Sequence, residues 1–250
     1  MPNLMTIGNN AFERCSKLYL TELPDSITEI GSSAFGYCTL VQLAHMPKDI
    51  VKIQSMAFAY TGLTLCDFTY STSLTDIGQN AFLNCKKLQS PNGLPASITT
   101  IGEGAFSSCT NFAFTMSADR YPNLISIASS AFSGTSISIE SLPENLEKIY
   151  NLAFANSIGG IMSFESIPSS VTLIGNSAFL GLSWSPVEGG RTLTLLNPAF
   201  EVNDQTGYFS KSLNGINSGV QALRVVNQEM LTLLQNTNGL GSGIADIAIE

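Results

Sequence analysis

An Ala-Phe pair recurs nine times at regular intervals along this chain, apart from an extra pair at Ala113-Phe114, and this spacing restricts the possible fold more than any other feature. Successive pairs lie 21 to 26 residues apart, which is close to a constant period. Self-similarity at such a period is typical of solenoids, in which every coil packs against the coils before and after it. The sequence therefore predicts a stacked array rather than one or two globular domains. The phenylalanines of the pairs are Phe12, Phe35, Phe58, Phe82, Phe106, Phe132, Phe154, Phe179 and Phe200.

The first half of each repeat has an alternating pattern. The best-preserved motif runs from Leu23 to Cys38 and reads LP-x-S-I-T-x-IG-x-x-AF-x-x-C. Apolar and polar residues alternate after each cysteine, as in Leu18-Tyr19-Leu20, which predicts half-buried strands stacked into a parallel sheet. Seven residues of these segments should point outward, namely Tyr19, Gln42, Thr64, Gln89, Ala113, Ser138 and Ser163.

The second half of each repeat carries apolar residues three and four positions apart, such as Ile27, Ile30 and Ala34. This spacing predicts a tight return segment on the opposite face, either helix-like or a short strand. The phenylalanines from Phe12 to Phe179 should stack inside, because phenylalanine is the large filler beside the small alanine.

A glycine commonly follows the second isoleucine of the repeat, as Gly31 follows Ile30. Gln54, Ala128 and Tyr150 take its place in other repeats. Such residues rarely adopt a positive φ, so the position favours a slim residue rather than requiring a left-handed turn.

The two ends of the chain depart from the repeat. Residues 1–7 match residues 121–127, which form the middle of a repeat, so the array should open on an incomplete coil. We expect either a longer parent array or a partner that covers this end. Residues 1–12 alone should fray or associate weakly end to end, leaving the chain mostly monomeric, because an open coil exposes strand edges. The repeats should cover residues 1–200.

The last fifty residues are predicted to form an irregular last repeat and a cap. Strands are expected over residues 191–196, 222–226 and 244–249, with a helix from Asn227 to Gln235. Asn227 suits the N-cap position of that helix, and Leu231 and Leu234 would point inward. Residues 201–250 should therefore close the array at its C-terminal side.

The fixed order of LP, IG, AF and Cys over residues 1–200 resembles the BspA-type leucine-rich repeat, also called the Treponema type. This resemblance implies a right-handed solenoid with a parallel sheet on its concave face, short helical or strand returns on its convex face, and an α/β C-terminal cap. It also implies a bacterial, extracellular location, at the cell surface or secreted, and adhesion to host matrix or cell-surface proteins. The family motif contains no catalytic residue, so the resemblance implies a protein that is not an enzyme.

Charge and hydropathy exclude other classes of partner. The net charge is −8 and the lysines and arginines are scattered, which argues against nucleic-acid binding. No apolar run reaches the ~18–20 residues needed to cross a bilayer, so we expect no membrane insertion of this segment. The first residues also lack the pattern of a signal peptide, and the expected location therefore rests on the family resemblance.

Four cysteines occupy one position of the repeat, three residues after the phenylalanine: Cys15, Cys38, Cys85 and Cys109. Thr61, Thr135 and Ser157 occupy the same position in other repeats. A metal site would not tolerate this exchange, whereas a buried position that hydrogen-bonds to the neighbouring backbone would. We therefore expect a structural ladder, with all five cysteines free and Cys66 in a core strand position. No metal or cofactor is predicted.

Isolated residues give weaker signals of catalysis. His45 is the one histidine, and it should lie at the solvent edge of a strand rather than in a catalytic triad or zinc site. Glu140 and Glu165 could lie side by side on the outward face, although a solvated rim is the simpler interpretation. Residues 239–243 should end a helix rather than bind phosphate. Trp184 could serve either as an exposed contact or as a core residue.

The leading hypothesis is a non-enzymatic surface protein that binds proteins through the outward side of its strands. Two alternatives stay open: a spacer that carries another domain, and a carbohydrate-binding module. Binding faces are usually rich in exposed aromatic residues, and Tyr19 is the sole aromatic among the outward positions, which keeps the spacer in contention. The candidate binding face consists of Tyr19, Gln42, Thr64, Gln89, Ser138, Glu140, Ser163 and Glu165.

Overall fold

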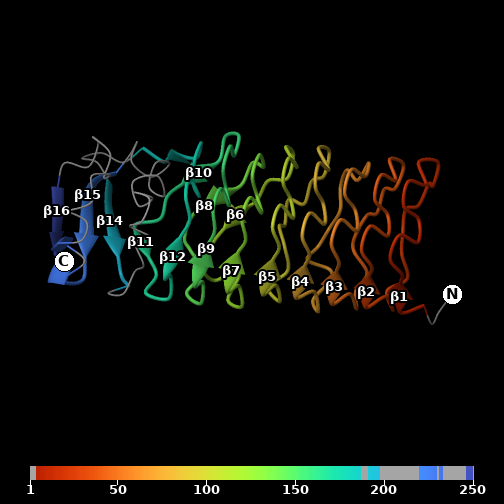
Figure 1. Ribbon diagram of the computed structural model, residues 1–250, viewed down its shortest axis with the longest axis horizontal. Coiled ribbons are helices and arrows are strands. Elements are labelled where there is room, and N and C mark those ends of the chain that lie inside the picture. The colour runs from red at the N-terminus through yellow and green to blue at the C-terminus, as the bar shows by residue number, and fades with distance from the viewer. Residues whose placement is uncertain (1–3, 187–190, 198–219, 230, 233–245, 250) are drawn as a thin grey trace.

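The chain folds into a solenoid in which each repeat makes one coil and the coils stack along a single axis (Figure 1). The computed structural model describes residues 4–186, 191–197, 220–229, 231–232 and 246–249. All strand pairs in these ranges are parallel, and only residues 228–229 and 231–232 of them are helical. The predicted parallel-strand solenoid is thus confirmed.

The longest sheet has eight strands and runs along the lower edge of the molecule in Figure 1. Each strand is two residues long and pairs with the same two positions of the next coil, as in Ile7 with Ile30. The second residue of every strand is a buried isoleucine. The first residue is polar in every strand except the last, where it is Leu173. The strands are β1 (Thr6–Ile7), β2 (Glu29–Ile30), β3 (Lys52–Ile53), β4 (Asp76–Ile77), β5 (Thr100–Ile101), β7 (Ser126–Ile127), β9 (Lys148–Ile149) and β12 (Leu173–Ile174).

The alternating half of the repeat pairs less continuously. In the coils towards the C-terminus this half forms a four-stranded sheet. In the coils towards the N-terminus it makes isolated bridges, such as Leu20 with Val41 and Leu65 with Gln89. The four strands, in sheet order, are β13 (Ser183–Trp184), β10 (Ile161–Met162), β8 (Ser138–Ile139) and β6 (Thr115–Met116).

The position of the long sheet corrects the sequence-based expectation. We expected the alternating half to form it, but the return half does. Of the two predictions for the return half, helix-like or a short strand, the short strand is the one found. In the seven repeats that have the proline, it lies 10 or 11 residues before the phenylalanine of the return half. The alternating half instead varies from 8 residues, between Thr135 and Pro143, to 13, between Cys109 and Pro122. A ladder needs the same register in every coil, so the half of constant length pairs throughout.

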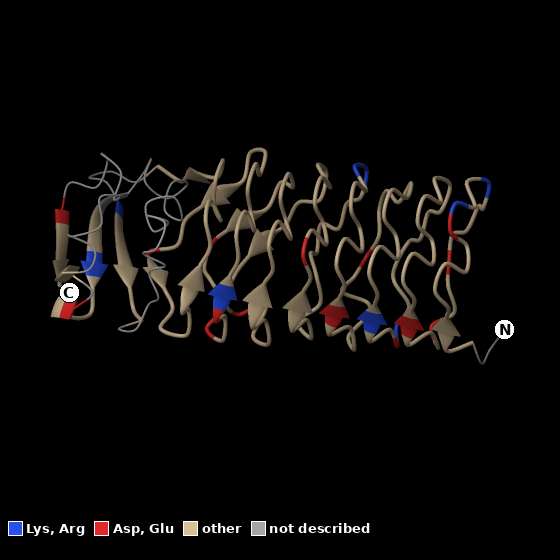
Figure 2. Cartoon of the chain, in the orientation of Figure 1, with Lys and Arg blue, Asp and Glu red and all other residues tan. Residues whose placement is uncertain are grey.

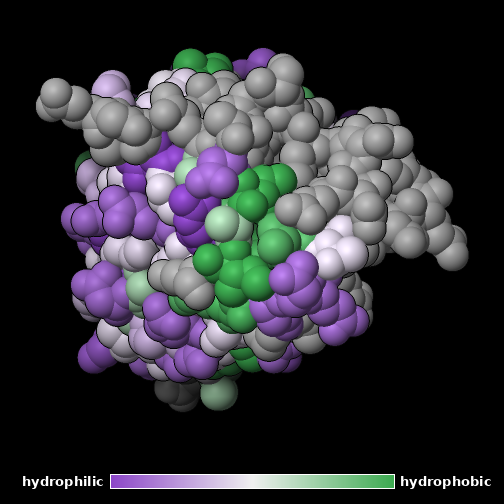
Figure 3. Space-filling view, turned by 90° about the vertical axis from the view of Figure 1, so that its left-hand side faces the viewer, coloured by the Kyte–Doolittle hydropathy of each residue, from purple (hydrophilic) through white to green (hydrophobic). Residues whose placement is uncertain are grey.

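A third sheet lies at the C-terminal side of the array, and its later strands occupy the region predicted as a cap. Leu231 donates its N–H to the carbonyl of Asn227, at 3.2 Å, and packs against the core. Met230, residues 233–235 of the predicted helix, the loop at 239–243, Phe200 and residues 201–219 lie outside the described residues. Figure 3 shows the molecule with its C-terminal side facing the viewer. The strands of this sheet, in order, are β11 (Ser166–Ile167), β14 (Arg191–Leu195), β15 (Val220–Val225) and β16 (Asp246–Ile249).

A column of phenylalanine rings forms the centre of the core. From Phe35 to Phe179 the repeated phenylalanines are fully buried, and neighbouring rings stack 5.1 to 5.7 Å apart. Phe12 stacks on Phe35 at 5.2 Å but is 39% exposed, because no described coil covers its other side. The expectation that Phe12 is also buried is therefore wrong.

The turn around each phenylalanine contains two residues with positive φ, one two positions before the ring and one two positions after it. In the second coil these are Ser33 and Tyr37, with φ of 54° and 63°. The amides of Ser33, Phe35 and Tyr37 donate to Ser55, Ala57 and Ala59 of the next coil, at 2.8 to 2.9 Å. Alternating the sign of φ thus turns three N–H groups of every coil towards the following coil.

The repeated glycine fits because the coils approach closely at that position. A Cβ on Gly78 would lie 2.8 Å from the carbonyl carbon of Gln54 in the preceding coil, and one on Gly102 would lie 2.7 Å from that of Gly78. Neither glycine has a positive φ. The interpretation of this position as a slim one is confirmed.

Replacing Phe106 with alanine should lower the free energy of unfolding by about 3–5 kcal/mol, because the ring lies at the centre of the column and leaves a cavity. Urea unfolding followed by circular dichroism would measure this. The matched change Phe12→Ala should cost much less, since that ring is already partly exposed. Equal losses for the two variants would contradict the column.

Ser130→Gly should stabilise the chain by up to about 1 kcal/mol, because Ser130 has a φ of 56° and Gly104 takes the same place in the preceding coil. The neighbouring change Ser129→Gly should destabilise it by about 0.5–1 kcal/mol, because Ser129 has no positive φ to relieve. Urea midpoints of the two variants would be compared, and a loss of stability for both would refute the strain at this turn.

Candidate functional site

The eight residues of the candidate binding face all reach the surface. Gln42, Ser138 and Ser163 are half-buried, and the other five are exposed, with Tyr19 at 72%. They lie on the alternating half of the coils, at or beside the bridges and the four-stranded sheet. The structure therefore places them along one side of the array, apart from the eight-stranded sheet.

Some of these residues contact one another, and in the coils of the four-stranded sheet their register is shifted by two residues from the expected one. Thr64 donates its hydroxyl to the side-chain oxygen of Gln42, at 2.7 Å. Ser138 pairs with Thr115 rather than with Ala113. The amide of Ser163 donates to Ile139, which places Ser163 beside Glu140 rather than beside Ser138. A two-residue shift keeps every side chain on its expected face, because the period of a strand is two.

Three apolar residues on this side were missed by the sequence analysis. Leu40 lies opposite Tyr19, as the Leu20–Val41 bridge requires, and is 47% exposed. Leu65 is 57% exposed and Ile161 is 46% exposed. Strict alternation would have buried Leu65, but the phase changes after Thr64, where two successive residues face solvent. The run of alternating residues there, which ends in the buried Cys66, gives no clear signal of that change.

Glu140 and Glu165 do not lie directly opposite each other. Glu140 lies beside Ser163, whereas a carboxylate oxygen of Glu165 lies 4.0 Å from Nη1 of Arg191. The side chain of Glu165 is 82% exposed, so solvent screens this ion pair and it contributes little to stability.

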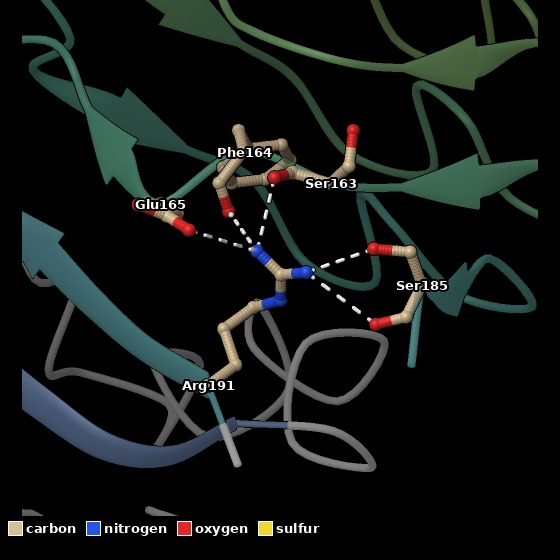
Figure 4. Close-up of polar contacts among 5 residues, drawn as sticks. All are labelled: Ser163, Phe164, Glu165, Ser185 and Arg191. Carbon is tan, nitrogen blue, oxygen red and sulfur yellow. Dashed lines mark hydrogen bonds and ion pairs between the residues drawn. The ribbon is translucent and has the colours of Figure 1, made fainter. Parts of the chain in front are cut away.

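Arg191, at the start of β14, ties three segments together beneath this face (Figure 4). Its guanidinium donates to the carbonyls of Ser163 and Phe164 and to the hydroxyl of Ser185, the last at 2.8 Å. It also lies 5.0 Å from the ring centre of Trp184, which packs against the core. The core alternative for Trp184 thus fits the structure better than a freely exposed contact.

The ladder position carries side chains that bond to phenylalanine carbonyls. Cys38, Cys85 and Cys109 are buried, and their thiols donate to Phe12, Phe58 and Phe82 of the preceding coil at 2.9 to 3.0 Å. The shorter hydroxyls of Thr61, Thr135 and Ser157 reach the phenylalanine carbonyl of their own coil instead. The position therefore accepts either side chain, provided that it can donate one hydrogen bond.

The other cysteines differ from this pattern. Cys15 is exposed, because no described coil lies on its N-terminal side, and Cys66 is buried within a strand segment. Burial raises the pKa of the Cys66 thiol, and burial followed by its contact with Cys85 raises that of Cys109. None of the five cysteines forms a disulfide bond.

His45 lies half-buried at the edge of the alternating side. Its Nδ1 lies 3.0 Å from the carbonyl of Met46, and its ring is 4.5 Å from that of Tyr70. Across the described ranges, His, Cys, Asp and Glu side chains nowhere gather in a group of three able to hold a metal ion. Within the same ranges, no helix has the length and apolar character to span a membrane.

Comparison with known proteins identifies the repeat. The model of the BspA type leucine rich repeat region matches residues 1–113 and 92–204, which is most of the chain. The chain belongs to this family. The expected resemblance is therefore confirmed, and LRR solenoids of this kind are typically not catalytic. No curated protein matches the sequence.

One solved structure supports the leucine-rich repeat fold. A leucine-rich repeat protein from Bacteroides ovatus is 19% identical over 99% of this chain, with a TM-score of 0.51. The chain spans 64% of that protein's length. The T. pallidum Leucine Rich Repeat protein is 25% identical over 71% of this chain and 70% of its own, with a TM-score of 0.48.

Thiol labelling should distinguish one cysteine from the other four. The native protein should react at once with a single equivalent of a thiol reagent, at Cys15, and with all five equivalents after unfolding, because burial shields the remaining thiols from the reagent. Cys15→Ser should abolish the fast reaction. Two or more fast equivalents in the native protein would contradict the buried ladder.

Proposed function

We propose that this chain is a non-enzymatic interaction module that binds a protein partner through the candidate binding face, at the cell surface or after secretion. The observation that carries the proposal is the group of large apolar side chains exposed on this face: Tyr19, Leu40, Leu65 and Ile161. Apolar residues in this setting favour association with a partner, since covering them removes apolar surface from water.

The surroundings of these side chains also suit a protein partner. Gln42, Thr64 and Gln89 lie among them and supply amide and hydroxyl groups at the surface. An apolar centre with a polar rim is the usual arrangement of protein–protein interfaces. Tyr19, Leu40 and Leu65 are exposed in three successive coils on one side, which supports binding over the spacer alternative.

The family supplies the kind of partner. The family resemblance implies that members of the BspA-type family contact host matrix or cell-surface proteins. The net charge of −8 further favours a partner surface that is not strongly acidic.

Binding of the chain to immobilised collagen, laminin and fibronectin, and to host cells, would test the proposal. The variant with Tyr19, Leu40 and Leu65 all changed to serine should bind at least tenfold more weakly, because the partner loses its apolar contacts. A control with Ile125→Ser and Leu180→Ser removes exposed apolar residues elsewhere and should bind normally. Unchanged binding of the triple variant, or no binding to any of these surfaces, would reject the proposal.

A further inference from the structure

A hollow of about 390 Å³ lies on the solvent side of the eight-stranded sheet, over β3, β4, β5 and β7. Its volume falls within the usual range of small-ligand sites, ~300–1,000 Å³. It belongs to the return half of the coils and is thus separate from the candidate binding face. Neither the family motif nor the proposed function assigns it a role.

The hollow exists because one row of the array lacks large side chains over three successive coils. The residues that follow the buried isoleucines there are Gly78, Gly102 and Ala128. At one end of the row the side-chain amide of Gln54 turns away to Glu29, at 2.7 Å. At the other end the row continues with Tyr150, whose side chain is partly exposed.

The row therefore forms a trough that runs along the solenoid axis and across the strands. From Gln54 to Ala128 it crosses three strand spacings, which is about 14 Å at ~4.8 Å per strand. A ligand that follows it must be a linear chain several units long.

The side chains that line the hollow carry both donors and acceptors, and the charges of Lys52 and Asp76 cancel. Lys52 and Asp76 begin neighbouring strands, and Figure 2 shows them as adjacent blue and red arrows. Thr100 and Ser126 follow in the next two strands, and the hydroxyl of Thr100 donates to Asp76 at 2.9 Å. Opposite charges side by side complement a neutral ligand rich in hydroxyl groups better than they complement a polyanion or an apolar molecule.

A peptide would find few partners in this trough. The amides of Gly78, Gly102 and Ala128 already donate to Ile53, Ile77 and Ile101 of the preceding coils, at 2.7 to 3.2 Å. Extended peptides that add to sheets depend on free main-chain groups at an edge. The floor of the trough offers none, so recognition there must rest on the polar side chains.

We propose that this trough binds a linear neutral oligosaccharide whose chain lies parallel to the solenoid axis. Hydroxyl groups along one edge of the sugar chain meet Lys52, Asp76 and Thr100, which can donate and accept. The partly exposed ring of Tyr150 offers an apolar surface for a sugar at the end of the row.

Calorimetric titration of the full chain with cellohexaose, xylohexaose, mannohexaose, laminarihexaose and maltohexaose would test the proposal. At least one of them should bind. Ala128→Gln should weaken that binding tenfold or more, because the side chain fills the trough, and Gln54 shows that the row accepts glutamine. Asn111→Gln places the same side chain at an exposed position outside the trough and should change nothing.

Two exposed positions provide variants that do not disturb the fold. Lys52→Met and Tyr150→Ser should each weaken binding several-fold, which holds even if Ala128→Gln fails to fold. Failure of all five sugars to bind at millimolar concentration would overturn the proposal, as would affinity unchanged in all three trough variants. The triple serine variant of the candidate binding face should keep its sugar affinity, so this result is independent of protein binding.

Discussion

The contact between successive turns around the phenylalanine holds the array together. Each turn stacks one ring on the next at 5.1 to 5.7 Å and donates three amide hydrogen bonds to the following coil. The two requirements support each other, because the ring can stack only when the amides hold the coils at a fixed distance. Side-chain hydroxyls of the return half add to this contact, as Ser26 does by donating to Leu4 of the preceding coil at 2.8 Å.

This contact also explains which substitutions the repeat tolerates. The ladder position accepts Cys, Thr or Ser because a single donated hydrogen bond meets its requirement. The position after the isoleucine prefers glycine because the neighbouring backbone lies within 2.8 Å of any added Cβ on Gly78. Neither preference reflects catalysis or metal binding, so a motif that is strict in sequence can be entirely structural.

Much of the fold could be predicted because the return half has a constant length. Its Pro-to-Phe distance of 10 or 11 residues fixes the coil, the core and the register at once. The candidate binding face was harder, because the alternating half changes length between coils. Its outward residues were identified, but their neighbours were misplaced by two positions, as for Ser163 and Glu140. Leu65 was missed for the same reason, since the phase of its strand changes locally.

Arg191 could not have been placed from the sequence. It has the same phase as the buried Leu193 and Leu195, yet its charge suggests an outward residue. Its partners, Ser163, Phe164 and Ser185, come from two segments whose proximity depends on the folded coils. A buried charge is tolerated only when such hydrogen-bond partners surround it, and no pattern in the neighbouring sequence indicates that these partners will lie there. The trough beside Gly78 and Gly102 is similarly hidden, because the sequence shows glycines but not the space they leave.

The three amides of each phenylalanine turn all point the same way along the array, from Phe35 towards Ala57 and from Phe82 towards Ala105. The stack is therefore directional: at the phenylalanine turns, each boundary has N–H groups on the preceding coil and carbonyl oxygens on the following coil, whereas the amides after the buried isoleucines donate in the opposite direction, as Gly78 does to Ile53. The peptide dipoles of these turns add along the axis, as they do in a helix. Two such arrays could extend one another only head to tail, since two like faces would set oxygen against oxygen. A further coil can therefore be added only in the same orientation as the coil that it contacts.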